Sequence, residues 1–212
     1  MLITPVPPVA CAMAFSTQLP MFLPGAPGLT RQAFLSAPPA LPSPAELVPG
    51  ALQAQQVFFL GLNQAANNSG TINPPAAGWR FLASDASSST SGQLLARVVQ
   101  IPPSPTWKLT GVFYGPRVSD AFAASEYVQN LPEVAKNDYV LRILAVPGLN
   151  LEAFWLVAQN AGSFDLIVPF PRITEQLIPA LRSQIPYKLG TFLALIRPLA
   201  GGLLTMTAGY GA

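Results

Sequence analysis

The sequence contains no histidine, and Cys11 is its single cysteine. Without histidine the chain lacks the commonest general base and metal ligand, and catalytic pairs that join a histidine to a serine or cysteine are excluded. One cysteine cannot form an internal disulfide bond, so it indicates neither an oxidising nor a reducing compartment. We therefore assign no catalytic, metal-ligating or cofactor-binding residues, and an enzymatic function is disfavoured.

Charged residues are also scarce, at 9% of the chain, against about 25% in an average soluble domain. Half of the residues are hydrophobic, and the mean hydropathy is +0.40. Surfaces this poor in charge usually contact a protein partner, a membrane or further copies of the same chain. The 11 basic residues are spread thinly, so a phosphate-binding surface for nucleic acid is disfavoured. A protein partner or self-assembly is expected.

The clearest pattern present lies between Tyr139 and Phe170. Three runs rich in β-branched, aromatic and aliphatic residues are separated by turn signals, and they predict a three-strand meander. The runs cover residues 139–146, 151–157 and 164–170. If the Pro147–Asn150 loop closes symmetrically, Arg142 lies opposite Trp155, because side chains alternate along paired strands. The runs are almost continuously apolar, which predicts that both faces are covered.

The pairing of Arg142 with Trp155 has two interpretations. An arginine beside a tryptophan commonly supports a sheet face through a cation–π contact. Alternatively, both residues form a patch with Tyr114 and Arg117 that receives an anionic or peptide ligand. We name Arg142 and Trp155 as candidate interaction residues.

Shorter signals predict further strands and two short helices. Apolar runs bounded by Gly, Pro, Asn or Ser predict strands, whereas helical spacing after a capping residue predicts helices. The predicted strands are 55–62, 79–83, 93–101, 107–114, 192–196 and 203–207, and the predicted helices are 119–130 and 174–185. The run at 93–101 is the expected antiparallel partner of 79–83. Gly111 predicts a bulge or a close approach inside its strand.

The apolar C-terminal segment begins near Leu189. Arg197, Pro198 and the Gly201–Gly202 pair interrupt it, so no run of about 18 apolar residues remains. We therefore predict no transmembrane span, and instead a strand pair that turns at the two glycines.

Residues 1–50 contain 11 prolines and only two charged residues. Proline restricts its neighbours and removes hydrogen-bond donors, which predicts an extended N-terminal arm. Phe15, Phe22 and Phe34 interrupt this arm. Such anchors are expected to dock onto the chain's own domain or onto a partner, so they are the remaining candidate interaction residues. A single domain over residues 51–212 is expected to follow the arm.

A secretion signal is disfavoured at the start of the chain. No basic residue precedes Arg31, and prolines interrupt the first apolar residues. The cellular location is left open, with the cytoplasm slightly favoured over secretion. Unless it is lipidated, Cys11 is expected to be an apolar filler within the arm.

One oxygen-rich loop offers an alternative function. Residues Asp85–Ser89 have the pattern D-x-S-x-S and resemble the ion-dependent adhesion site of von Willebrand A-like domains. That resemblance implies a divalent cation held by the aspartate and two serine oxygens. In that family a helix follows the loop, whereas a strand is predicted here. A solvated serine-rich hairpin loop is the other interpretation.

Together these patterns predict an α+β fold. It comprises a mostly antiparallel sheet with the meander at 139–170, two short helices and a proline-rich N-terminal arm. The favoured function is a non-enzymatic structural or protein-interaction subunit of a larger assembly. Two alternatives stay open: a domain that binds a divalent metal or uses Asp and Ser chemistry, and a peripheral membrane or secreted protein.

Overall fold

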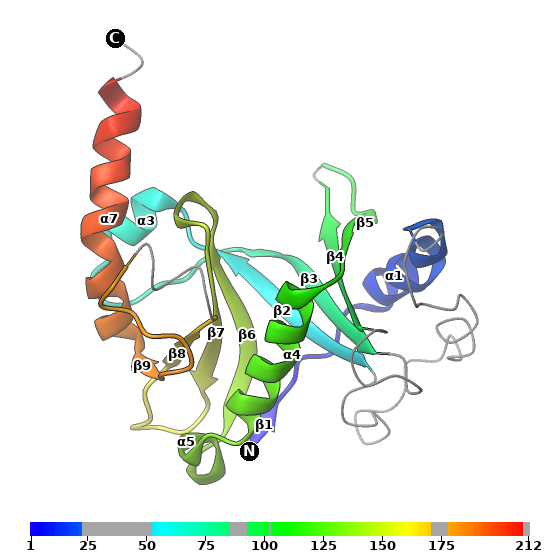
Figure 1. Cartoon of the computed structure of the whole chain (residues 1–212), viewed down its shortest axis with the longest axis horizontal. Helices are drawn as coiled ribbons and strands as arrows, with labels where there is room; N and C mark the ends of the chain where they lie inside the picture. The colour runs from blue at the N-terminus through cyan, green and yellow to red at the C-terminus, as the bar shows by residue number, and fades with distance from the viewer. Residues whose placement is uncertain (23–51, 85–92, 102, 171–177, 210–212) are drawn as a thin grey trace. The chain divides into compact units, whose positions relative to one another are not determined.

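The computed structural model describes residues 1–22, 52–84, 93–101, 103–170 and 178–209 (Figure 1). It has an α+β fold with a large, mostly antiparallel sheet, which confirms the predicted fold class. The chain divides into two compact units, each described here by itself. Unit 1 comprises Met1–Thr4, Val57–Ala76 and Ala124–Ala212, and unit 2 comprises Pro5–Gln56 and Ala77–Ala123. The predicted boundary at residue 50 stays a prediction, because it lies outside the described residues.

Unit 2 is built on strands that pair in the order β5-β4-β3-β2. Their bounds are β2 Leu52–Phe59, β3 Ala76–Ser84, β4 Gln93–Gln100 and β5 Trp107–Phe113, with β2 continuing into unit 1. The predicted antiparallel pairing of the second and third of these strands is confirmed. The β4–β5 register shifts beside Gly111, as its position in the strand predicted. Burial alternates along β4, so one face carries the core.

Helix α1, Val9–Phe22, completes the core of unit 2. The ring of Phe15 stacks on that of Phe81, with centroids 4.4 Å apart. The prediction of an extended arm is therefore wrong for residues 9–22. The prolines of this region flank an alanine-rich interval, and the carbonyl of Pro8 accepts the backbone N–H groups of Cys11 and Ala12 at the helix start. Composition averaged over 50 residues concealed that interval.

Unit 1 contains the pairing order β2-β6-β7-β8-β9, with β1 parallel to β6. The bounds are β1 Leu2–Ile3, β6 Tyr139–Val146, β7 Leu151–Ala158, β8 Leu166–Pro169 and β9 Tyr187–Lys188. The predicted hairpin register is confirmed: Val146 pairs with Leu151, and Arg142 pairs with Trp155. Pro147–Leu149 forms a single 3-10 turn. Asn150, which directly precedes β7, adopts the left-handed conformation with a φ of 48°.

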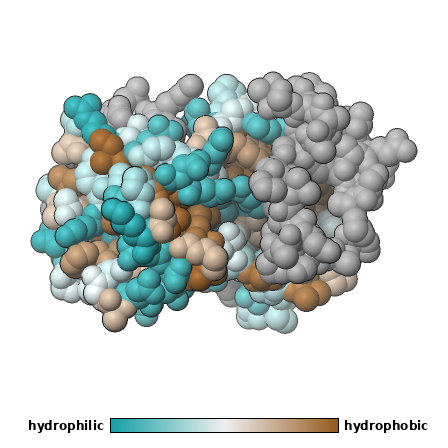
Figure 2. All heavy atoms as spheres, turned by 90° about the horizontal axis from the view of Figure 1, so that it is seen from below, coloured by the Kyte–Doolittle hydropathy of each residue, from teal (hydrophilic) through white to brown (hydrophobic). Residues whose placement is uncertain are grey.

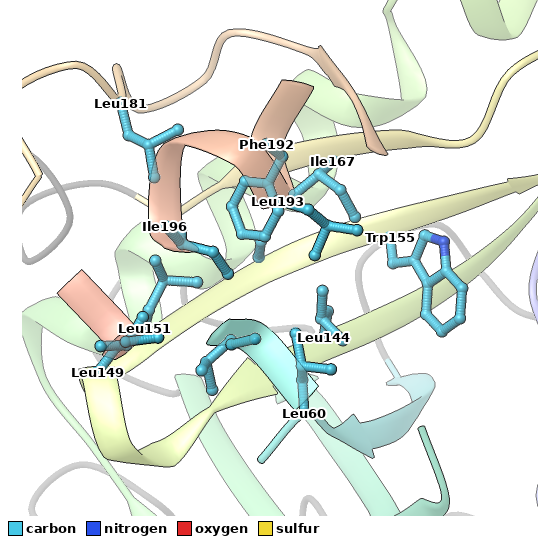
Figure 3. Packing of buried hydrophobic residues seen from close by; sticks show 14 of the residues in the cluster. Leu60, Leu144, Leu149, Leu151, Trp155, Ile167, Leu181, Phe192, Leu193 and Ile196 are labelled. Carbon is cyan, nitrogen blue, oxygen red and sulfur yellow. The ribbon is translucent and has the colours of Figure 1, made fainter. Parts of the chain in front are cut away.

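The strands of unit 1 carry a separate hydrophobic core on each face. On one face, helices α3, Leu62–Asn67, and α7, Leu189–Gly209, cover the strands, and Figure 3 shows α7 side chains directed at strand side chains. The other face is covered by two further helices, α4, Pro116–Gln129, and the short α5, Pro132–Lys136. Only the second half of α4 contributes to this core. Burial on both faces confirms the expectation drawn from the continuously apolar strands.

Three local predictions differ from the structure. The C-terminal segment is one helix, α7, rather than a strand pair, because its buried residues Phe192, Ile196 and Ala200 recur at helical spacing. Residues 62–67 form α3, a helix that was not predicted, although residue 62 was expected to end the strand 55–62. The described part of the predicted helix 174–185, residues 178–185, forms turns, and Gln184 has a φ of 57°. The predicted helix 119–130 is confirmed as α4.

Candidate functional site

A row of alternating aromatic and charged side chains crosses one face of the unit 1 strands. It runs from Phe58 on β2 through Arg142 on β6 and Trp155 on β7 to Asp165, immediately before β8. We call these four residues the cation–aromatic row.

Two aromatic rings hold the guanidinium of Arg142 in a corner. Its Cζ atom lies 4.7 Å from the centroid of the Phe58 ring and 5.3 Å from that of the Trp155 ring. The two rings are nearly perpendicular, at 82°, with centroids 5.5 Å apart. Each such cation–π contact contributes about 0.5–2 kcal/mol, depending on how far the cation is desolvated. The corner therefore restricts where the guanidinium lies.

The carboxylate of Asp165 fixes the indole ring from its other side. Its Oδ2 atom accepts a 2.9 Å hydrogen bond from Trp155 Nε1, and its Oδ1 atom accepts a 2.9 Å hydrogen bond from the backbone N–H of Ala158. A buried indole requires such an acceptor, and Trp155 is only 4% exposed. Asp165 thus orients the ring that Arg142 contacts.

The charge of Arg142 is partly removed from water. Burial lowers the pKa of its guanidinium from the ordinary value, and the negative charge of Asp165 opposes this shift. The Nε atom is buried and has no hydrogen-bond acceptor among the described residues. A desolvated cationic donor without an acceptor is costly, so this arrangement needs an explanation beyond the support of the sheet.

The face that carries the row has a covered end and an open end, which meet at Trp155. The covered end consists of the strand residues buried in the core that α3 and α7 complete: Leu144, Val146, Leu151 and Ala153. The open end consists of residues that alternation places on the same face and that are partly exposed: Val140, Arg142 and Val157. Trp155 lies at the margin of the side-chain cluster in Figure 3.

A second feature of unit 1 is the end of α7. Ala200 is the last fully buried residue of the described part of this helix, and no side chain in the following segment, Gly201–Met206, is buried. We call this segment the distal α7 segment. In Figure 1 this end of α7 extends past α3. Arg197 donates from Nη2 to the Asn68 carbonyl at 2.7 Å and to its Oδ1 at 3.1 Å, close to the place where the distal segment begins.

The residues Leu189–Met206 of α7 are long and apolar enough to cross a membrane, the one such helix in the described part of the chain. Only 22% of this window is buried inside the protein. A helix that packs on a soluble core passes the same test, and Phe192, Leu193 and Ile196 are fully buried in the core of unit 1. Figure 2 shows other apolar side chains at the surface, among hydrophilic ones.

The structure brings together Arg142 and Trp155, two of the five candidate interaction residues. Phe15 lies in the core of unit 2, and Phe22 is 42% exposed at the end of α1. Phe34 lies outside the described residues.

Tyr114 and Arg117, which the ligand-patch interpretation included, belong to unit 2, whereas Arg142 and Trp155 belong to unit 1. Phe58 and Asp165 were not predicted as members of the row. The one sequence signal that pointed to Asp165 is its place in the predicted strand 164–170, which follows the strand of Trp155 in the meander. No sequence signal pointed to Phe58.

No metal-binding cluster of three or more Cys, Asp or Glu residues occurs among the residues that the structure describes. The serine-rich loop Asp85–Ser89 lies outside them, so its predicted alternative stays a prediction. The carboxylates of Glu152 and Asp165 do not form an acid–base pair on one face. Glu152 pairs with Ala145, which belongs to the opposite core, while Asp165 contacts Trp155.

The sequence matches no protein-family model, and comparisons with curated proteins and with solved structures also find no match. Function therefore has to be inferred from the residues of the chain itself.

Proposed function

We propose that this protein is a non-enzymatic subunit of a larger assembly, and that it binds another polypeptide through the distal α7 segment. The observation that supports this is the unequal burial of one continuous helix. Up to Ala200, α7 packs on the core of unit 1, whereas Leu204 is only partly buried and Met206 is 65% exposed. Contact with a partner would bury these side chains.

The energetics favour an occupied distal segment. In the distal segment Leu203 packs against the core of unit 1, and burying a further large apolar side chain contributes about 1.5–3 kcal/mol. A helix end with so little tertiary packing is marginal by itself. Gly201 and Gly202 also disfavour the helix by about 1 kcal/mol each relative to alanine. A Cβ atom at either glycine would meet nothing within 4 Å, so packing inside the described chain does not require glycine there. Close approach by a partner helix would require glycine at these positions.

The proline-rich arm and the meander at 139–170 have supporting roles in this proposal. The outward side of α1, which carries Val9, Met13 and Met21, is also exposed and apolar. The arm would thus add contacts to a partner, while the meander would be the rigid platform on which α7 is mounted.

A peripheral membrane role is the alternative, motivated by the apolar length of α7. We favour a polypeptide partner because the buried half of the helix belongs to the chain's own core. Spanning a bilayer takes about 20 residues, and α7 could supply them only by withdrawing Phe192, Leu193 and Ile196 from that core. The distal segment also begins with two glycines and includes Thr205.

The test is a double substitution in the distal segment, Leu204→Glu with Met206→Glu, in the full chain. Its matched control is Thr191→Glu, which adds a charge at an exposed position near the other end of α7. Sedimentation velocity over a range of concentrations reports self-assembly, and affinity purification from the native source reports a stable partner.

The double variant should lose the assembly or the partner, and the control variant should keep it. The proposal would be overturned if the wild-type chain sediments as a monomer and also retains no partner whose binding depends on Leu204 and Met206. Flotation with phosphatidylcholine vesicles that the double variant loses would also overturn it, in favour of the membrane alternative.

A further inference from the structure

Arg142 lies between two groups of side chains. On one side are the partly exposed Val140 and Val157, and on the other are the rings of Phe58 and Trp155. Its guanidinium has five N–H donors in a planar fork, and its Nε atom is buried without a hydrogen-bond acceptor among the described residues. The carboxylate of Asp165, which accepts a hydrogen bond from Trp155, forms no ion pair with Arg142 within 4.0 Å among the residues that the structure describes. We propose that Arg142 binds the carboxylate group of an aliphatic ligand at the open end of this face.

The rings of Phe58 and Trp155 determine the side from which the ligand approaches. Both lie within 5.3 Å of the guanidinium carbon, and they close two directions around it. The N–H groups at the remaining edge are the donors that a carboxylate accepts in a bidentate pair. Because the rings already hold the side chain, little conformational entropy is lost when the pair forms.

The carboxylate of Asp165 is engaged elsewhere. Its two oxygens accept hydrogen bonds from Trp155 Nε1 and from the backbone N–H of Ala158. The donors at the remaining edge of the guanidinium are therefore left for a ligand, and their planar spacing matches the two oxygens of a carboxylate.

The apolar surface beside Arg142 favours an aliphatic chain in the remainder of the ligand. Val140 and Val157 are direct cross-strand partners and are partly exposed. They lie one pair along from Arg142 and Trp155 on the same face, which corresponds to about 7 Å along the strands. An aliphatic chain of several carbon atoms, attached to the carboxylate, would span that distance and cover both valines. The ligand class is thus an aliphatic carboxylic acid, either free or as the C-terminal residue of a polypeptide.

The test is a nuclear magnetic resonance titration of the full chain with hexanoate, with hexanol and acetate as matched probes. The indole N–H signal of Trp155, identified by its loss in Trp155→Phe, reports the corner directly. Hexanoate should shift this signal saturably, whereas hexanol lacks the charge and acetate lacks the chain. Arg142→Met should weaken hexanoate binding at least about tenfold, which is 1.4 kcal/mol, while the control Arg182→Met should leave it unchanged.

Arg142→Lys retains the charge but not the planar fork, so it keeps the measurement possible if the methionine variant does not fold. It should bind hexanoate more weakly than wild type does. A peptide that ends in leucine, compared with its C-terminal amide, distinguishes a polypeptide source from a free acid. Equal shifts with hexanol and hexanoate, no saturable shift, or unchanged affinity in the Arg142 variants would show that water alone solvates the guanidinium. That result would leave the role of α7 untouched, because no residue is shared.

Discussion

The covered end and the open end of one sheet face in unit 1 have similar strand sequences and different surroundings. At the covered end, Leu144 and Val146 lie in the core with residues of α7, whereas Val140 on the same strand is partly exposed. Successive side chains alternate between the two faces of the sheet in the same way at both ends. The difference is set by how far a helix from another part of the chain reaches, so burial here is a tertiary property rather than a local one.

Removing the residue at which the two ends meet should have the largest effect. Trp155→Ala deletes a ring that is 4% exposed, contacts Phe58 and Arg142, and donates to Asp165. We expect the free energy of unfolding to fall by about 3–5 kcal/mol. Urea denaturation measures this directly. A loss below about 1 kcal/mol, as at ordinary surface sites, would show that the ring does not belong to the core.

A pair of truncations on β6 tests the comparison between the two ends. Leu144→Ala should lower the free energy of unfolding by about 2–5 kcal/mol, because it opens a cavity in a fully buried site. Val140→Ala, two residue pairs away on the same face, should cost about 1 kcal/mol or less. The two variants are compared in the same denaturation experiment. Similar losses at both positions would mean that the open end is covered after all.

The sequence was sufficient to predict the strands and the hairpin register of the central region. Pro147–Asn150 marks the turn, and the register follows because side chains alternate from that fixed point. The cation–aromatic row was only half predictable. Arg142 and Trp155 are paired by a local hairpin, but Phe58 reaches them from a strand more than 80 residues earlier, and no local pattern encodes that contact.

Two of the helices that were not predicted, α1 and α7, were missed for a related reason. In α1, residues 9–19 contain no proline, but the many prolines before and after them dominated the composition and concealed this interval, which packs on Phe81. In α7, the Gly201–Gly202 pair was interpreted as a turn, although the buried residues before it already had helical spacing. In both cases tertiary packing stabilises a helix that propensity disfavours.

Changing the acceptor beside Trp155 should have an intermediate effect and sharpen the boundary between the ends. Asp165→Asn keeps the shape of the side chain but replaces one accepting oxygen with an N–H donor, although both carboxylate oxygens accept hydrogen bonds in the structure. We expect a loss of about 1–3 kcal/mol, the cost of leaving a buried donor without its acceptor. Denaturation and the indole N–H signal of Trp155 measure it. An unchanged signal would contradict the hydrogen bond.

Unit 2 offers the same contrast on a single helix. Cys11 and Phe15 of α1 lie in the core, while Met13 between them is 57% exposed. Burial raises the pKa of the Cys11 thiol from its ordinary value of 9.0 to about 12. The thiol should therefore react with a thiol reagent at pH 8 much more slowly than in the unfolded chain, because the thiolate is the reactive form. Equal rates in native and unfolded protein would contradict its burial.

A small stability change is expected for Cys11→Ala, and it should depend on pH. At pH 7 the loss should be about 1 kcal/mol, for one buried sulfur atom. The folded state holds the thiol proton more tightly than the unfolded chain does, so the contribution of the raised pKa is complete below pH 9 and is lost as the pH rises towards 12. Wild type should lose this contribution over that window, and the alanine variant has none to lose. Tyr114, whose pKa burial also raises, titrates in both proteins and cancels in the difference. The loss is about 1.4 kcal/mol per pH unit above pH 9, so at pH 10.5 it exceeds the contribution of about 1 kcal/mol that the buried sulfur makes at pH 7. Denaturation should therefore find wild type more stable than the alanine variant at pH 7 and less stable at pH 10.5, and an unchanged difference would show that Cys11 is exposed to water.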